Sequence, residues 1–255
     1  MKILNILLIY LIVALLVSCN ERTESEPNYE NRIVFDISKS VDLNIEMANH
    51  ISKNTIELAF ADSIVIPAYS RLLISDDDFI IYSQRTFQLF RFDEAGSFKN
   101  LIGKRGVGPG EFTEMRDVII NSQNKNIIEI LDREAILEYQ LDGSFVKRTQ
   151  IDFPAFSFAS DNNNYWFYIG NNPSFSQFKL LQTDNNFRKK EEYFAIAEKG
   201  IPLIENNFGI GSYLTYKESL NPQLYILNDK IKKSYFIDFG KFKLPEDIES
   251  YDPFQ

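Results

Sequence analysis

The sequence predicts an all-β fold, and within that class a β-propeller built from four-stranded blades. After residue 30 the chain consists mainly of short aromatic and β-branched runs that Gly, Asn and Asp residues separate, which is the pattern of short strands joined by turns. One turn motif also recurs at steps of 49 and 42 residues, close to the about 40–50 residues of a propeller blade. A β-sandwich with coincidentally similar hairpins is the alternative.

The amino-acid composition narrows the functional class. The chain has 255 residues, 44% of them hydrophobic, so it can bury a sizeable core. Its formal net charge of −9 argues against a nucleic-acid partner, because phosphate binding needs a basic surface. The single Cys and the single His, Cys19 and His50, exclude an intrachain disulfide and metal sites rich in Cys or His. No residue pattern indicates a cofactor or a metal, and we expect neither.

Residues 1–18 predict the signal peptide of a lipoprotein. Lys2 precedes an apolar run from Ile3 to Val17 that is short for a membrane span, and this is the layout of a secretory signal. The segment Leu16-Val17-Ser18-Cys19 resembles a bacterial lipobox. This resemblance implies cleavage before Cys19 and lipidation, including palmitate, of its thiol and new amino group. An uncleaved anchor and an ordinary signal with an incidental Cys are the alternatives.

Residues 19–32 are expected to be the lipidated Cys and a flexible tether. The stretch from Asn20 to Glu30 is polar and carries four Glu residues and Pro27, a composition that does not favour a packed core. In some outer-membrane lipoproteins, acidic residues after the lipidated Cys accompany export to the surface, and a solvated linker is an equal alternative. We expect a lipid-anchored protein of the cell envelope, at the outer membrane, on its periplasmic or its surface face.

The repeat consists of an acidic turn followed by an aromatic residue. Its copies begin at Asp93, Asp142 and Asp184, and a degenerate fourth copy is Asn228-Asp229-Lys230-Ile231. Asp-Gly and Asn-Asn supply the backbone conformations that join two antiparallel strands in a tight turn. We expect strands at the apolar runs around these turns, including residues 79–82, 87–92, 127–131, 136–139, 165–169 and 234–237.

The run Gly103–Phe112 holds four of the chain's 11 Gly residues, and two interpretations of it stay open. Its backbone amides, together with Lys104 and Arg105, could bind an anion such as a carboxylated sugar or a phosphate. Alternatively, the run is a structural crossover between blades, in which Gly provides left-handed backbone and the acid caps or pairs locally. The residues with this structural role would be Gly106, Gly108, Pro109, Gly110 and Glu111.

The segment Gly106–Phe112 resembles the G-x-G-P-G-E-[FY] signature found at a blade boundary in a bacterial family of six-bladed β-propeller lipoproteins. The phrases Phe90–Phe98 before it, and Ile130–Asp132 and Tyr139–Phe145 after it, also fit that family. The resemblance covers residues 56–153 well and the later blades loosely. It implies a six-bladed propeller and a lipid anchor. It implies no activity, because the molecular function of the family is mostly unassigned.

Residues 33–255 are expected to form the propeller, and they are few for six blades. Six blades of about 45 residues would need about 270, against 223 from Ile33 to Gln255. The pattern indicates a partial blade at 33–60 and four repeats near 61–114, 115–158, 159–205 and 206–250. We expect a propeller of the six-bladed type that is short or truncated, with four to five blades, rather than a true five-bladed ring.

No residue pattern indicates a catalytic constellation. Asp76-Asp77-Asp78 lacks the spacing of a calcium loop and is more simply a solvated hairpin turn. His50 lies in a weakly patterned stretch, and no Gly-x-Ser-x-Gly motif supplies a nucleophile. Tyr165, Trp166 and Tyr168 form the most attractive aromatic cluster. Their rings could stack on a sugar, or they could pack between blades.

We predict a non-enzymatic binding or scaffold module that is anchored at the outer membrane and binds a protein, a peptide or a glycan. Propeller loops from every blade gather around one axis, which suits recognition. The candidate ligand-binding residues are Lys104, Arg105, Tyr165, Trp166 and Tyr168, and we assign no catalytic and no metal-binding residue. Two alternatives stay open: a propeller-type lyase or hydrolase that acts on a polysaccharide at the central channel, and a truncated propeller without independent activity.

Overall fold

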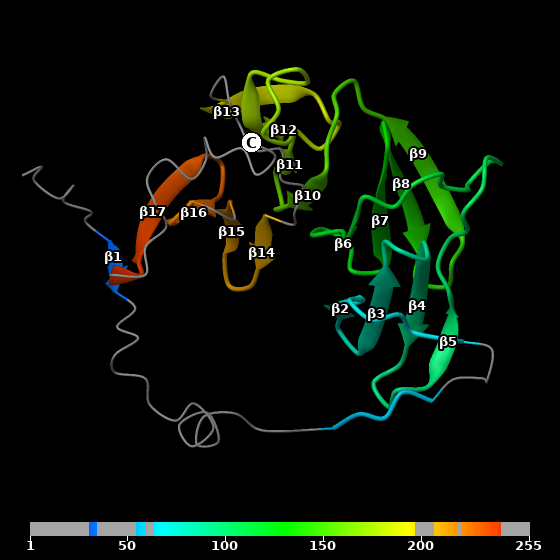
Figure 1. Ribbon diagram of the computed structural model, residues 1–255. Coiled ribbons are helices and arrows are strands. Elements are labelled where there is room, and N and C mark those ends of the chain that lie inside the picture. The colour runs from blue at the N-terminus through cyan, green and yellow to red at the C-terminus, as the bar shows by residue number, and fades with distance from the viewer. Residues whose placement is uncertain (1–30, 35–54, 60–63, 197–206, 219–220, 241–255) are drawn as a thin grey trace, which may run out of the picture. The chain divides into compact units, whose positions relative to one another are not determined.

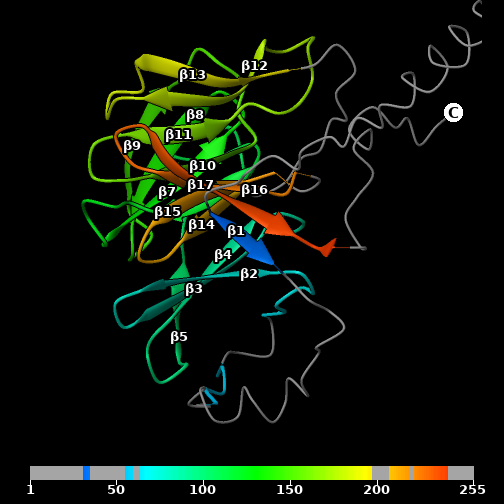
Figure 2. The same ribbon diagram turned by 90° about the vertical axis from the view of Figure 1, so that its left-hand side faces the viewer.

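The computed structural model describes residues 31–34, 55–59, 64–196, 207–218 and 221–240, which all belong to one compact unit, Asn31–Gln255 (Figure 1, Figure 2). Within these residues the chain forms 17 strands. The described residues include no helix that is long and apolar enough to cross a membrane. The predicted all-β class is confirmed. The predicted signal peptide, Cys19 and His50 lie outside the described residues.

The strands form four sheets, and the first two are antiparallel meanders of four strands each. Consecutive strands pair in chain order, so each sheet is one blade. Blade 1 consists of β2 (Arg71–Ser75), β3 (Asp78–Ser83), β4 (Gln88–Phe92) and β5 (Phe98–Leu101). Blade 2 consists of β6 (Asp117–Ile120), β7 (Ile127–Asp132), β8 (Ala135–Gln140) and β9 (Phe145–Gln150).

The third and fourth sheets repeat this arrangement. Blade 3 consists of β10 (Ser157–Ser160), β11 (Tyr165–Tyr168), β12 (Phe178–Thr183) and β13 (Lys189–Ala195). Blade 4 consists of β14 (Phe208–Ile210), β15 (Leu214–Lys217), β16 (Gln223–Leu227) and β17 (Ile231–Asp238). A fifth strand, β1 (Arg32–Val34), pairs in parallel with β17, so the first and the last strands of the described chain share one sheet. The predicted β-propeller with four repeats is thereby confirmed.

The repeated acidic turns join the third and fourth strands of each blade. The Oδ1 atom of Asp93 accepts the backbone N–H of Ser97 at 2.8 Å, and the Oδ1 atom of Asp142 accepts that of Ser144 at 2.8 Å. These hydrogen bonds from backbone N–H groups are the first cause that lowers the pKa of both carboxyls below the usual range. The aspartate of the repeat therefore acts as the acceptor that closes the turn, which is a structural role.

The third copy of the turn also uses an aspartate as its hydrogen-bond acceptor, but a residue other than Gly takes the left-handed conformation. Asp184 accepts the backbone N–H of Arg188 at 2.9 Å. Where the earlier copies have Gly96 and Gly143 with positive φ, Phe187 takes a φ of 59°. A left-handed conformation is costly for a bulky residue, and burial of the Phe187 ring in the core holds it there.

Three apolar clusters fill the junctions between successive blades. The inner strands contact one another in order, β2 with β6, β6 with β10 and β10 with β14. Alternate side chains of each strand point to opposite faces of its sheet, so every junction is one apolar sheet face against another. Representative buried residues are Ile80, Tyr82 and Ile130 between blades 1 and 2, Phe158, Phe167 and Phe187 between blades 2 and 3, and Trp166, Tyr168 and Tyr216 between blades 3 and 4.

Candidate functional site

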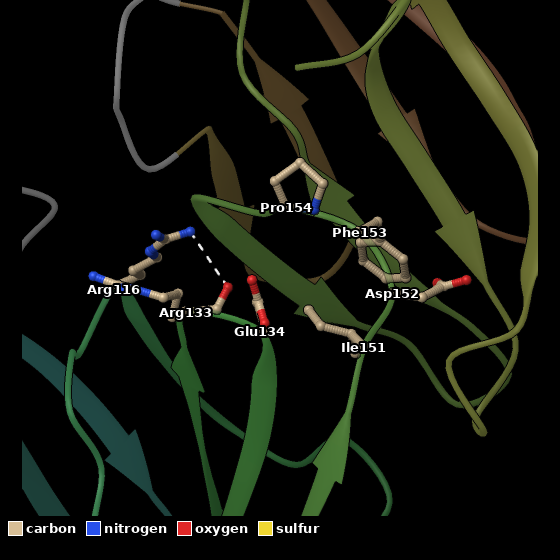
Figure 3. A pocket seen from close by; sticks show the side chains of 7 residues that line it. All are labelled: Arg116, Arg133, Glu134, Ile151, Asp152, Phe153 and Pro154. Atoms are coloured by element: carbon tan, nitrogen blue, oxygen red, sulfur yellow. Dashed lines mark hydrogen bonds between the residues drawn. The ribbon is translucent and has the colours of Figure 1, made fainter. Parts of the chain in front are cut away.

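A pocket of about 470 Å³ opens at one end of blade 2, beside the connection to blade 3 (Figure 3). Three segments supply its lining: the residue before β6, the turn between β7 and β8, and the connection from β9 to β10. The connection contains the sequence Asp152-Phe153-Pro154, and proline restricts the residue before it to extended backbone. The lining residues are Arg116, Arg133, Glu134, Ile151, Asp152, Phe153 and Pro154.

One acid holds both arginines of the pocket. Arg116 Nε donates to one carboxylate oxygen of Glu114 at 2.9 Å, and Arg133 Nη2 donates to the other at 2.6 Å. The hydrogen bond from Arg133 is the largest cause that lowers the pKa of Glu114 below its usual range. Arg116 also donates from Nη1 to the backbone oxygen of Ala155 at 3.0 Å, and its guanidinium lies 5.5 Å from the ring centre of Phe156. Arg116 is thus fixed by three contacts, while Arg133 is largely exposed.

The base of the pocket is apolar, and its rim carries both acidic and basic side chains. Ile151 and Phe153 are buried, and the Phe153 ring meets the edge of Phe167 at a centroid distance of 4.9 Å. Glu134 and Asp152 are exposed at the rim, and neither forms an ion pair with any residue that the structure describes. The pocket therefore offers an apolar surface for a side chain and two carboxylates for a cationic group. Sequence reasoning missed it, because its residues come together only when two separate turns meet.

The Gly-rich loop has the geometry of a structural crossover. A Cβ atom on Gly106 would lie 1.9 Å from Oε2 of Glu111, so only Gly leaves room for that carboxylate. The same oxygen accepts the backbone N–H of Gly108 at 2.9 Å, and this bond is the first cause that lowers the pKa of Glu111. Gly110 has a φ of 73°, and its carbonyl accepts the hydroxyl of Tyr139 at 2.9 Å. Pro109 lies within the turn that these contacts close.

The two cations proposed for anion binding lie at the base of this loop. Lys104 Nζ pairs with Oε1 of Glu111 at 3.1 Å, and its side chain is 78% exposed. The Arg105 guanidinium lies 4.2 Å from the ring centre of Phe87, and its Nε donates to the backbone oxygen of Thr113 at 3.4 Å. Because the Glu111 carboxylate already occupies the loop amides and Lys104, the loop holds an internal anion in the place where a ligand was expected.

The three aromatic residues proposed for sugar stacking are buried. Tyr165, Trp166 and Tyr168 lie in β11 at the two junctions that blade 3 makes, and each is at most 6% exposed. Trp166 packs against Tyr193 with a centroid distance of 5.6 Å, and Tyr165 meets the edge of Phe187 at 4.8 Å. Strand β11 is buried on both faces, so these rings serve packing between blades and present no face to a ligand.

Asp117, the first residue of β6, connects three blades. Its Oδ1 accepts hydrogen bonds from Arg71 Nη1 and from the Tyr82 hydroxyl of blade 1, each at 3.1 Å. Its Oδ2 accepts the backbone N–H of Phe158 of blade 3 at 3.0 Å. Burial raises its pKa to about 6, although Arg71 acts in the opposite direction. All three of these contacts are internal, so the perturbed acid has a structural task.

Glu129, in the middle of β7, is a second buried acid that sequence reasoning missed. Its Oε1 accepts hydrogen bonds from the Tyr165 hydroxyl and from Asn121 Nδ2, each at 2.6 Å. Its Oε2 has no hydrogen-bond partner within the described chain. Burial raises its pKa to about 7. The signal in the sequence was one Glu within the apolar run Ile127-Ile128-Glu129-Ile130-Leu131.

No group of three or more His, Cys, Asp or Glu residues in the described part of the chain could hold a metal ion. Asp76, which has a φ of 46°, and Asp77 lie in the hairpin turn between β2 and β3. Asp78 pairs with Arg91, whose Nε and Nη2 reach its two oxygens at 2.8 and 2.9 Å. The acidic run therefore forms the turn and one ion pair within blade 1.

Solved proteins share this fold. A candidate exported protein from Bacteroides fragilis is similar with a TM-score of 0.61 at 19% sequence identity, over 72% of this chain and 55% of that chain. A DUF4221-family protein from Bacteroides vulgatus is similar with a TM-score of 0.50 at 10% identity, over 74% of this chain and 63% of that one. This chain thus spans less than two thirds of the length of either protein. At these identities the similarity shows the fold alone.

A family comparison is more specific. None of the curated proteins matches the sequence. The family model DUF5128, described as a 6-bladed beta-propeller, matches residues 21–250, a range that contains all four blades. The Gly-rich crossover, the acidic turns and the apolar blade junctions all lie inside the matched range. Because the model matches most of its length, the chain belongs to the DUF5128 family of six-bladed β-propellers.

Proposed function

We propose that this chain is a non-enzymatic binding module of the cell envelope, which a lipid on Cys19 anchors at the outer membrane and which binds a protein or peptide partner. The signal-like residues 1–18 and the lipobox resemblance at Cys19 support the anchor. The similarity to a Bacteroides fragilis protein that is described as a candidate exported protein supports export. A propeller hosts many functions, so the binding proposal rests on a specific site and not on the fold.

The pocket between blades 2 and 3 carries the binding proposal. Ile151 and Phe153, 4% and 6% exposed, offer a small apolar contact at its base, and the carboxylates of Glu134 and Asp152 suit a cationic group. A peptide supplies both kinds of group on neighbouring residues. A glycan is less well matched, because the rings that would stack on a sugar are buried. Lys104 and Arg105, at the neighbouring junction, are proposed as peripheral contacts for acidic groups of the same partner.

Thermal unfolding of the full-length protein in detergent tests the binding proposal. A ligand that binds only the folded state raises the midpoint, and the rise grows with the logarithm of the ligand concentration above the dissociation constant. Cationic peptides that contain an aromatic or aliphatic residue should raise the midpoint, whereas acidic peptides and neutral oligosaccharides should not. The double variant Glu134→Gln, Asp152→Asn should lose the response, and the matched control Glu94→Gln, an exposed acid in blade 1, should keep it. A response to oligosaccharides alone would contradict the proposal, as would no response to any peptide.

Fractionation and labelling test the anchor. The wild-type protein should incorporate labelled palmitate and separate with outer membranes, since several acyl chains anchor a protein firmly. The Cys19→Ala variant should incorporate no label and leave the outer-membrane fraction. A wild-type protein without label, or label in the Cys19→Ala variant, would refute acylation at this residue. Separation of the labelled wild-type protein with the inner membrane would refute only the outer-membrane assignment.

A further inference from the structure

The junction between blades 2 and 3 contains a row of ionisable side chains within otherwise apolar packing. Glu129 in β7 lies directly opposite Glu138 in β8, and Glu138 lies opposite Lys147 in β9. Directly opposed residues of antiparallel strands have their Cβ atoms about 5 Å apart on the same face. All three side chains therefore lie on one face of blade 2. It is the face that blade 3 covers, because Tyr165 of β11 reaches Glu129.

The three members of the row differ in how their charges are compensated. Lys147 Nζ pairs with Oε1 of Glu138 at 3.0 Å, and both side chains reach solvent in part. Glu129 is fully buried and forms no ion pair with any residue that the structure describes. Among these residues, only the neutral Tyr165 hydroxyl and Asn121 amide donate to it, and both donate to Oε1. Its Oε2 has no hydrogen-bond partner in the part of the chain that the structure describes.

An ionised Glu129 is therefore poorly accommodated. A buried carboxylate needs donors on both oxygens or an opposite charge, and here one oxygen has neither. The charge that faces it from β8 is the like charge of Glu138, which also raises the pKa of Glu129, whereas Lys147 of β9 lowers it. Tyr165 of β11 and Asn121 before β7 donate hydrogen bonds that oppose the effect of burial. A proton on Oε2 would remove the buried charge and keep both hydrogen bonds to Oε1.

We propose that Glu129 is a proton-binding site that makes the junction between blades 2 and 3 pH-sensitive, closely packed when Glu129 is neutral and loosened when it is ionised. The direction follows from linkage. Burial raises the pKa of Glu129 from 4.5 to about 7 on folding, so its contribution to stability is complete below the lower value. That contribution is lost as the pH rises through the upper one.

Urea unfolding of the full chain from about pH 4 to pH 9, a range that brackets both pKa values, tests the proposal with one mimic and one control. Glu129→Gln places an uncharged amide where the neutral carboxyl lies, so its urea midpoint should equal that of the wild type at acid pH and exceed it at alkaline pH. Glu94→Gln changes an exposed acid of blade 1 and should follow the wild type throughout. A Glu129→Gln midpoint that stays below the wild type by the same amount at every pH would overturn the proposal.

Two measurements on the wild type keep the proposal testable even if Glu129→Gln folds poorly. Infrared difference spectra should show a protonated carboxyl that disappears with a midpoint near pH 7, and Tyr165→Phe, which removes a donor, should move that midpoint upward. Hydrogen exchange, corrected for intrinsic rates, should accelerate at β7 and β11 above this midpoint while β3 of blade 1 stays protected. A carboxyl that titrates below about pH 5, the ordinary range of Glu, or equal acceleration in all blades, would refute the proposal.

Discussion

Replacing Tyr165 by Phe removes one hydroxyl from the junction between blades 2 and 3 and leaves its ring in place. The ring packs edge-on against Phe187 with a centroid distance of 4.8 Å and stacks near Phe167 at 6.2 Å, and Phe preserves both contacts. The substitution deletes the hydrogen bond to Oε1 of Glu129 at 2.6 Å and the one that Asn121 donates to the hydroxyl at 3.2 Å. The change in stability therefore reports on hydrogen bonding to Glu129 and not on packing.

The magnitude follows from the charge of the acceptor. A hydrogen bond to a neutral group contributes about 0.5–1.5 kcal/mol to stability, and one to a charged group about 1.5–3 kcal/mol. Burial raises the pKa of Glu129 to about 7, so the acceptor is neutral near pH 5.5 and charged near pH 8.5. We expect Tyr165→Phe to reduce the free energy of unfolding by about 1 kcal/mol at the lower pH and by about 2–3 kcal/mol at the higher pH.

Urea denaturation at the two pH values is the assay, and Tyr139→Phe is the matched control. Tyr139 is equally buried, and its hydroxyl donates at 2.9 Å to the backbone oxygen of Gly110, which does not ionise. Its removal should cost about 1 kcal/mol at both pH values. The reasoning fails if Tyr165→Phe costs the same at both pH values, or if Tyr139→Phe shows the same pH dependence.

Two further pairs of substitutions test the packing of the blades. Gly110→Ala should lower the free energy of unfolding by about 2 kcal/mol, because φ is 73° and a Cβ would lie 2.7 Å from the ring of Phe145. Gly211→Ala should change it by less than about 0.5 kcal/mol, because no atom of the residues that the structure describes lies within 4 Å of the added Cβ. Phe167→Ala should cost about 3–5 kcal/mol through the cavity that it leaves, whereas Phe175→Ala, 60% exposed, should be near neutral. Urea midpoints of the four variants measure these effects, and equal losses within either pair would contradict the assignment of core and surface.

The sequence was sufficient to predict the blades, because each turn depends on residues that lie close together along the chain. An acidic side chain that caps its own turn depends on residues two to four positions away, so Asp93, Asp142 and Asp184 mark the same hairpin in three blades. The Gly-rich crossover is local in the same way. Glu111 fills the space that Gly106 leaves and accepts the N–H of Gly108. The structural interpretation of this loop therefore required no knowledge of neighbouring blades.

The candidate site was not predictable, because it depends on which face of a strand meets another blade. Tyr165, Trp166 and Tyr168 have the composition of a sugar platform, and only the burial of β11 on both faces shows that they are core. The pocket residues are misleading in the opposite way, because they look like surface residues without a role although they line a site. Arg133 and Asp152 belong to separate turns that look like ordinary solvated connections in the sequence, and only the pairing of β8 with β9 in the folded blade makes them neighbours.

Two of the buried acids of blade 2, Asp117 and Glu129, explain how apolar sheet faces keep one relative position. Apolar contact is non-directional, so a flat face alone does not select one alignment of two blades. Asp117 adds directional hydrogen bonds to Arg71 and Tyr82 on one side and to the Phe158 amide on the other. Glu129 adds one to Tyr165. Burial raises the pKa of Glu129 to about 7, so a rise in pH places a buried charge at the junction of blades 2 and 3 and leaves the apolar area unchanged. A rise in pH should therefore first loosen the alignment of blades 2 and 3, before the sheets themselves unfold.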